Sequence, residues 1–249
     1  MATDTALRWQ TRGKMLMLPV NCKVLESPED VAGQACRIVI AEAEAAIRER
    51  RMFRIVLAGG RTPQRTYQML AGMVQDWSAW EIFWSDERCL PSDHAGRNSR
   101  MAQDAWLSQV AIPAGQIHPI PAELGATLAA AEYTKLVLDR QPFDLLLLGM
   151  GEDGHTASLF STGGDPVAPV IAVHGAPKPP GERVSLNFET LRACRKQLVL
   201  ITGAEKSPAL FAWQHGASLP IAHAVRNDAC LLVDSEAGRS TNFAVPGHY

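Results

Sequence analysis

The chain has 249 residues, with 24 Lys plus Arg against 26 Asp plus Glu and a formal net charge of −2. This near balance argues against a strongly basic nucleic-acid-binding protein. A composition of 47% hydrophobic and 20% charged residues is typical of a globular protein, and it excludes a disordered, collagen-like or coiled-coil chain.

The cysteines and the amino terminus bear on the compartment. Five cysteines stand far apart with no C-x-x-C pair, which argues against a disulfide framework or a zinc ribbon. The amino terminus lacks the charged and apolar regions of a signal peptide, and no later apolar run has the length of a membrane span. We therefore expect a cytoplasmic protein with reduced thiols and no membrane partner.

Helical and apolar segments alternate along the chain. Ser27 followed by Pro28 and two acids predicts a helix start, and a basic cluster near Arg50 predicts its end. Short apolar runs predict buried strands at 53–58, 82–84, 144–148, 197–201 and 230–233. Helices are predicted at 63–71, 99–107, 124–139, 155–160 and 206–215. The alternation predicts a doubly wound, mainly parallel α/β sheet flanked by helices, in a single domain over 1–249.

Ligands in such a fold bind in the loops at the carboxyl ends of the strands. The first of these loops contains Gly59, Gly60, Arg61, Thr62 and Pro63. Glycines let backbone amides approach an anion, threonine can cap and donate, and proline suits the first position of a helix. The loop is typical of a phosphate cradle or, alternatively, of a tight strand-to-helix turn without a ligand.

The second loop carries three charged residues directly after an apolar strand, Asp86, Glu87 and Arg88. The planar fork of an arginine suits a phosphate or a carboxylate, which makes Arg88 a candidate anion-binding residue. The alternative is a local ion pair between Arg88 and Asp86 or Glu87.

In the third loop, Gly149, Gly151 and Gly154 have the G-x-G-x-x-G spacing of a dinucleotide site. A ribose would need an acid at the end of a strand about 20 residues downstream. The strand expected there, 170–173, is followed by His174 instead. We therefore do not favour a nicotinamide oxidoreductase.

A general base fits the third loop better. His155 stands at a strand end with Asp153 two residues away, where a carboxylate can orient the imidazole or adjust its basicity. The alternative is that Asp153 caps a helix and His155 is an ordinary surface residue.

The fourth loop brings Lys206 into a helix from a glycine turn, where a lysine can reach a phosphate as a point charge. Arg183, before the apparent strand 184–186, is a second candidate cation. The Pro/Gly-rich segment 175–181 is predicted to be a surface loop. No nucleophile elbow, P-loop lysine, HExxH or EF-hand pattern is present, so we expect no catalytic metal.

Four motifs of this chain together resemble the 6-phosphogluconolactonase family in their order and spacing. They are GGRTPxxxY from Gly59, DERCLPxxHxxxNSxM from Asp86, GMGEDGHTASLF from Gly149 and TGAEK from Thr202. The resemblance implies a modified Rossmann-like fold shared with glucosamine-6-phosphate deaminase and ribose-5-phosphate isomerase, without a nucleotide or other cofactor. It also implies hydrolysis of 6-phospho-D-glucono-1,5-lactone, a small-molecule sugar phosphate, in the oxidative pentose phosphate pathway. Family members often carry serine where Arg61 stands.

The residues and the implied reaction give each group a role. His155 takes a proton from the water that attacks C1, Asp153 orients His155, and Arg88 binds the substrate or steadies the oxyanion. The phosphate and the sugar hydroxyls are expected to bind Gly59, Gly60, Arg61, Thr62, Asp86, Arg183 and Lys206.

Two further functions remain open. The first is an amino-sugar-phosphate deaminase or isomerase of the same fold. That family has motifs similar to GHIAFNEP and DEY, whereas this chain has Thr156 to Phe160 and Arg88 at those places. A non-catalytic sugar-phosphate-binding regulator would keep the pocket and lose the chemistry, but the chain retains His155 beside Asp153. The sequence does not reveal whether the protein has a protein partner.

Overall fold

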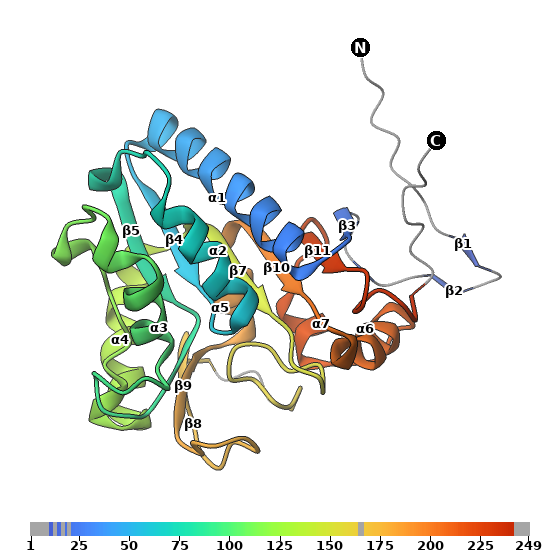
Figure 1. Cartoon of the computed structure of the whole chain (residues 1–249). Coiled ribbons are helices and arrows are strands. Elements are labelled where there is room, and N and C mark those ends of the chain that lie inside the picture. The colour runs from blue at the N-terminus through green and yellow to red at the C-terminus, as the bar shows by residue number, and fades with distance from the viewer. Residues whose placement is uncertain (1–9, 12–13, 16–17, 19–20, 164–166, 242–249) are drawn as a thin grey trace.

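A six-stranded parallel sheet is the centre of the protein. The computed structural model describes residues 10–11, 14–15, 18, 21–163 and 167–241. In spatial order the strands are β3 (Asn21–Leu25), β11 (Cys230–Asp234), β10 (Cys194–Ile201), β7 (Phe143–Gly149), β4 (Phe53–Leu57) and β5 (Trp80–Trp84), each parallel to its neighbour (Figure 1). From β4 the chain runs outward to β5, then returns to β7 and continues in the other direction. The crevice at this reversal, between β4 and β7, is where such sheets bind ligands.

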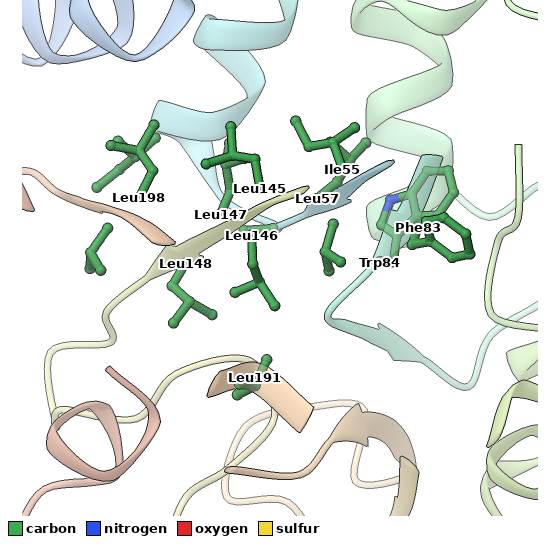
Figure 2. Close-up of a cluster of buried hydrophobic side chains, with 14 of the residues drawn as sticks. Ile55, Leu57, Phe83, Trp84, Leu145, Leu146, Leu147, Leu148, Leu191 and Leu198 are labelled. Atoms are coloured by element: carbon green, nitrogen blue, oxygen red, sulfur yellow. The ribbon is translucent and has the colours of Figure 1, made fainter. Parts of the chain in front are cut away.

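The central strands are buried on both faces, as their continuous apolar runs predict. In β7, Leu145 and Leu147 point to one face of the sheet, and Leu146 and Leu148 point to the other, toward Leu191 (Figure 2). All five side chains are at most 1% exposed. Burial of this kind contributes roughly 2 kcal/mol for each leucine, so the sheet holds the loops at its edge firmly in place.

Helices cover this sheet. The long helix α1 (Pro28–Arg50) begins with a complete capping box between Ser27 and Asp30, and it packs against α2 (Arg61–Ala71) and against β4, β7, β10 and β11. The remaining α-helices of the described residues are α3 (Asn98–Ala105), α4 (Ala126–Arg140), α5 (Phe188–Arg192), α6 (Ser207–Gln214) and α7 (Pro220–Ala224). Single 3-10 turns lie at η1 (Trp77–Ala79), η2 (Leu107–Gln109), η3 (Ala114–Gln116), η4 (Ala122–Leu124) and η5 (Ala204–Lys206).

A second, antiparallel sheet stands beside the first, with the strand order β6 (Asp86–Arg88), β9 (Arg183–Leu186) and β8 (Val170–Val173). Ser85 joins the two sheets: its N–H donates to the carbonyl of Leu57 at 2.9 Å, and its carbonyl accepts from Leu186 at 2.8 Å. The crevice residues that follow β5 are therefore held by both sheets. A separate pair, β1 (Gln10–Thr11) and β2 (Lys14–Met15), is also antiparallel.

Most predicted elements are confirmed, with ends that differ from the prediction by up to three residues, and one predicted helix is wrong. The second helix begins at Arg61 and not at Pro63. Residues 155–160 form no helix and contain only a bridge between Thr156 and Leu159. Gly154 and Ala157 adopt positive φ angles of 81° and 49°, a backbone conformation that no α-helix contains.

The cysteines and the helices bear on two of the expectations from the sequence. All five cysteines lie in the described part of the chain, and none of them forms a disulfide. No helix among the described residues is both long enough and apolar enough to cross a membrane.

Candidate active site

The four motif loops meet around a cavity of about 360 Å³ at the carboxyl ends of β4 and β7. The cavity is lined by seven of the residues predicted from sequence, namely Gly59, Gly60, Asp86, Arg88, His155, Arg183 and Lys206, and also by Asn98, Glu152 and Lys178. Arg61 and Thr62 line an adjoining cavity of about 610 Å³ that shares the Gly59-Gly60 turn. Asp153 contacts His155 from outside the first cavity.

Hydrogen bonds connect the motif loops in pairs. The Ser158 hydroxyl of the third loop donates to Oδ2 of Asp86 in the second at 2.6 Å. Between the first and fourth loops, the Oγ1 atoms of Thr62 and Thr202 lie 2.6 Å apart. Hydrogen bonds thus join segments that are distant in the sequence at the rim of the cavity.

The first loop needs glycine at position 59 because Asn98 presses against it. A Cβ atom there would lie 2.2 Å from Oδ1 of Asn98. The Asn98 amide in turn donates to the backbone carbonyl and to Oδ1 of Asp86, at 3.0 and 3.1 Å. Gly60 has a φ of 111°, which strongly favours glycine. The turn therefore has a structural reason for both glycines, whether or not an anion binds there.

His155 is held against a carboxylate. Its Nδ1 is hydrogen-bonded to Oδ1 of Asp153, its backbone N–H donates to the same oxygen at 3.2 Å, and its ring lies 4.6 Å from that of Phe160. A carboxylate at Nδ1 favours the tautomer with the proton on Nδ1, which leaves Nε2 free to accept a proton. The side chain is 17% exposed, so water can reach the ring.

The electrostatics of Asp153 suit this arrangement. Partial burial raises its pKa, but the hydrogen bonds that it accepts from the side chain and backbone of His155 lower it, and the net result lies below the ordinary value. Asp153 is therefore ionised at neutral pH and can stabilise the imidazolium that forms when His155 takes up a proton.

Two glycines of the third loop make room for neighbouring side chains, Gly151 for His155 and Gly154 for Leu219. A Cβ atom at Gly151 would lie 2.1 Å from Cε1 and Nδ1 of the imidazole. Gly154 has a φ of 81°, and a Cβ there would lie 2.8 Å from Leu219. The imidazole thus occupies the space beside Gly151 that a dinucleotide would have to enter. The G-x-G-x-x-G spacing has a different physical cause here from the one it has in nucleotide-binding folds.

In the second loop, the predicted alternative of an ion pair between Arg88 and its neighbours is wrong. The buried Glu87 accepts from the backbone N–H groups of Arg88, Asn98 and Ser99, at 2.9, 2.7 and 2.8 Å, and it pairs with Arg97. The Arg88 side chain donates instead to the carbonyl of Gly96 at 2.5 Å. Its Nε is buried without a partner among the described residues, and the side chain lines the cavity.

Arg183 lines the cavity and also supports the segment 175–181, which the sequence predicts to be a surface loop. Its guanidinium donates to the carbonyls of Lys178, Pro179 and Pro180 at 2.8 to 3.2 Å. Burial, and next the positive charge of Arg88, lowers its pKa below the usual value. The sequence analysis missed Lys178 because the Pro/Gly-rich composition of the segment 175–181 predicts a loop but does not predict toward which groups that loop turns.

The remaining cations differ in how close they are to the site. The Lys206 side chain is 18% exposed, and its Nζ lies 3.5 Å from Oε2 of Glu152. The Arg61 side chain is 95% exposed, and its ion pair in the described part of the chain is with Glu205, at 4.0 Å. No group of three or more His, Cys, Asp or Glu side chains in the described part of the chain is placed to hold a metal ion.

Comparisons with known proteins agree with this geometry. A family model described as glucosamine-6-phosphate isomerases/6-phosphogluconolactonase matches residues 26–233. The chain is 32% identical over 241 residues to a 6-phosphogluconolactonase of Mycobacterium leprae, covering 88% of this chain and 98% of the relative. It is 35% identical over 201 residues to a 6-phosphogluconolactonase of Synechocystis, covering 75% and 82%. A solved 6-phosphogluconolactonase of Thermotoga maritima superposes with a TM-score of 0.80 at 29% identity, covering 86% of this chain and 98% of that one.

Proposed function

We infer, for a chain that belongs to the family of glucosamine-6-phosphate isomerases and 6-phosphogluconolactonases, that it hydrolyses 6-phospho-D-glucono-1,5-lactone to 6-phospho-D-gluconate in the oxidative pentose phosphate pathway. The observation that carries this function is the His155–Asp153 pair on a cavity lined by cationic side chains. The site thus combines a base for activating water with charges suited to a phosphorylated substrate.

We propose that His155 acts as a general base. The carbonyl carbon of a lactone is electrophilic enough to be attacked by water, so catalysis needs an activated water and a stabilised oxyanion but no covalent nucleophile. Nε2 of His155 takes the proton of the attacking water while the water oxygen bonds to C1. The imidazolium then returns the proton to the ring oxygen as the bond from C1 to that oxygen breaks. Asp153 keeps the ring oriented and stabilises its positive charge.

Substrate binding is assigned to the rim of the cavity. Lys206, the backbone of Gly59 and Gly60, and the neighbouring Thr62 and Arg61 are proposed to hold the phosphate. Asp86 and Arg183 are proposed to contact the sugar. Arg88, with its buried and unpartnered Nε, binds the substrate or steadies the oxyanion. Binding energy from a phosphate far from C1 would position the lactone for attack.

The relatives favour the lactonase over the deaminase, since those of Mycobacterium leprae and Synechocystis, aligned over 88% and 75% of this chain, carry the name 6-phosphogluconolactonase. We further propose that residues 1–249 form a single lactonase domain. We also propose that it acts in the cytoplasm on a free sugar phosphate, without a nucleic-acid partner. The near-balanced charge and the unpaired cysteines support this.

An assay with two lactones tests the function. Freshly generated 6-phosphogluconolactone should be hydrolysed well above its spontaneous rate, as followed by acid release in a pH-stat. Because the phosphate supplies remote binding energy, kcat/KM for unphosphorylated gluconolactone should be lower by about 100-fold or more. No acceleration of phospholactone hydrolysis, or release of ammonia from glucosamine 6-phosphate, would contradict the assignment.

A further inference from the structure

Glu152 lies between two lysines that come from different parts of the chain. Its Oε1 accepts from Nζ of Lys178 at 2.5 Å, and its Oε2 lies 3.5 Å from Nζ of Lys206. All three residues line the candidate active-site cavity. A single carboxylate therefore bridges the two ammonium groups at the mouth of the site.

The Glu152 carboxylate is ionised at neutral pH and is exposed to solvent. The pKa of Glu152 is lowered to about 2, first by the hydrogen bond from Lys178, with further contributions from its own backbone and from the charges of Lys178 and Lys206. Its side chain is 51% exposed. An exposed ion pair is only weakly held, so Glu152 can turn toward water at little cost when a stronger anion arrives.

The backbone positions of Lys178 and Lys206 do not depend on their contacts with Glu152. The carbonyl of Lys178 accepts from the buried Arg183, and those of Pro179 and Pro180 do the same, so the backbone of this segment is fixed independently of Glu152. Lys206 ends the turn η5, which is closed by a hydrogen bond from its N–H to the carbonyl of Gly203 at 3.0 Å. Neither ammonium group has another partner among the described residues.

We propose that Glu152 is a resident counter-anion which the substrate's phosphate displaces, and that Lys178 and Lys206 then bind this phosphate together. A phosphate dianion carries more charge and more acceptor oxygens than a carboxylate, so it competes successfully for two ammonium groups. This proposal rests on the proposed function, and it adds Lys178 to the binding residues. In this proposal Glu152 competes with incoming anions, and it weakens the binding of those that carry less charge or fewer acceptor oxygens than a phosphate dianion.

The charge-removing variant Glu152→Gln tests the proposal through the sign of its effect. If Glu152 competes with the substrate, the variant should lower KM for 6-phosphogluconolactone, and the inhibition constant of inorganic phosphate, by about three- to tenfold. Lys178→Met should raise both. If Glu152 instead held the lysines in place for the substrate, Glu152→Gln would raise both values. Either a rise or no change would overturn the proposal.

A matched control is Glu182→Gln, which removes an equally exposed carboxylate that pairs with His174 and does not line the cavity. Its KM should stay within about twofold of wild type. Binding of inorganic phosphate, measured by calorimetry, requires no turnover. Tighter binding by Glu152→Gln in a protein that hydrolyses no lactone would therefore contradict the proposed function and uphold the anion exchange. If the protein is an active lactonase but Glu152→Gln binds phosphate as wild type does, the proposed function is upheld and the anion exchange is contradicted.

Discussion

Replacing His155 by alanine should lower kcat for 6-phosphogluconolactone by about 100- to 10,000-fold, the usual contribution of a general base. The expected loss lies in kcat because the imidazole acts on the attacking water, whereas the phosphate is bound by other residues. The measurement is the initial rate of acid release, corrected for spontaneous hydrolysis, at saturating substrate.

His215→Ala is the control for this variant, since His215 is exposed, lies at the end of α6, and its ring contacts Phe211 of that helix. A His155→Gln variant, which keeps a polar side chain of similar size, separates loss of the base from loss of packing against Phe160. Both His155 variants should be impaired alike. If either of them retained kcat within tenfold of wild type, His155 would not be the base.

Adding a single methyl group at Gly151 should be nearly as damaging as removing the imidazole. The Cβ of Gly151→Ala would overlap the ring of His155, with separations of 2.1 Å from both Cε1 and Nδ1 and of 2.7 Å from Oδ1 of Asp153. The ring must therefore move away from the position in which Asp153 holds it. A misplacement of about 1 Å can cost roughly 100-fold in rate, and we expect a loss of kcat of at least that size.

The comparison for Gly151→Ala is Gly115→Ala, at a glycine where a Cβ would meet no atom within 4 Å. Circular dichroism and thermal unfolding establish that each variant is folded before its kinetics are compared. A folded Gly151→Ala enzyme with the wild-type kcat would show that the imidazole does not need its position beside Asp153.

The sequence predicts the central sheet well because its signals are local. Leu145 to Leu148 form a continuous apolar run, and the Ser27 capping box marks the start of α1. The meeting of the four loops is also predictable, because the carboxyl ends of parallel strands share one edge of a sheet. The apolar pattern of the strands therefore brings His155 and Lys206 to the same cavity.

What the sequence does not predict depends on strand pairing and on the conformation of individual loops. The strand β6 is three residues long and charged, so no apolar run marks it, although the strands at 170–173 and 184–186 that complete the antiparallel sheet are predicted. Residues 155–160 are compatible with a helix, but the positive φ angles of Gly154 and Ala157 exclude one. Lys178 lines the cavity in a segment whose backbone carbonyls accept from the nearby buried Arg183, and the Pro/Gly-rich composition of this segment predicts a loop without its direction.

The measurement that tests the account most directly is the pH dependence of phospholactone hydrolysis by the wild-type enzyme between about pH 5 and pH 8, with the spontaneous rate subtracted at each pH. Histidine is the side chain that ordinarily changes charge in this range. The two carboxylates of the His155 loop do not, since the pKa of Glu152 is about 2 and that of Asp153 lies below its ordinary value. A base must be neutral to accept a proton, so kcat at saturating substrate, which does not depend on the ionisation of the free substrate's phosphate, should fall as the pH is lowered through this range. An enzymatic rate that stays constant from pH 8 to pH 5, or no enzymatic rate at all, would contradict a histidine base acting on this lactone.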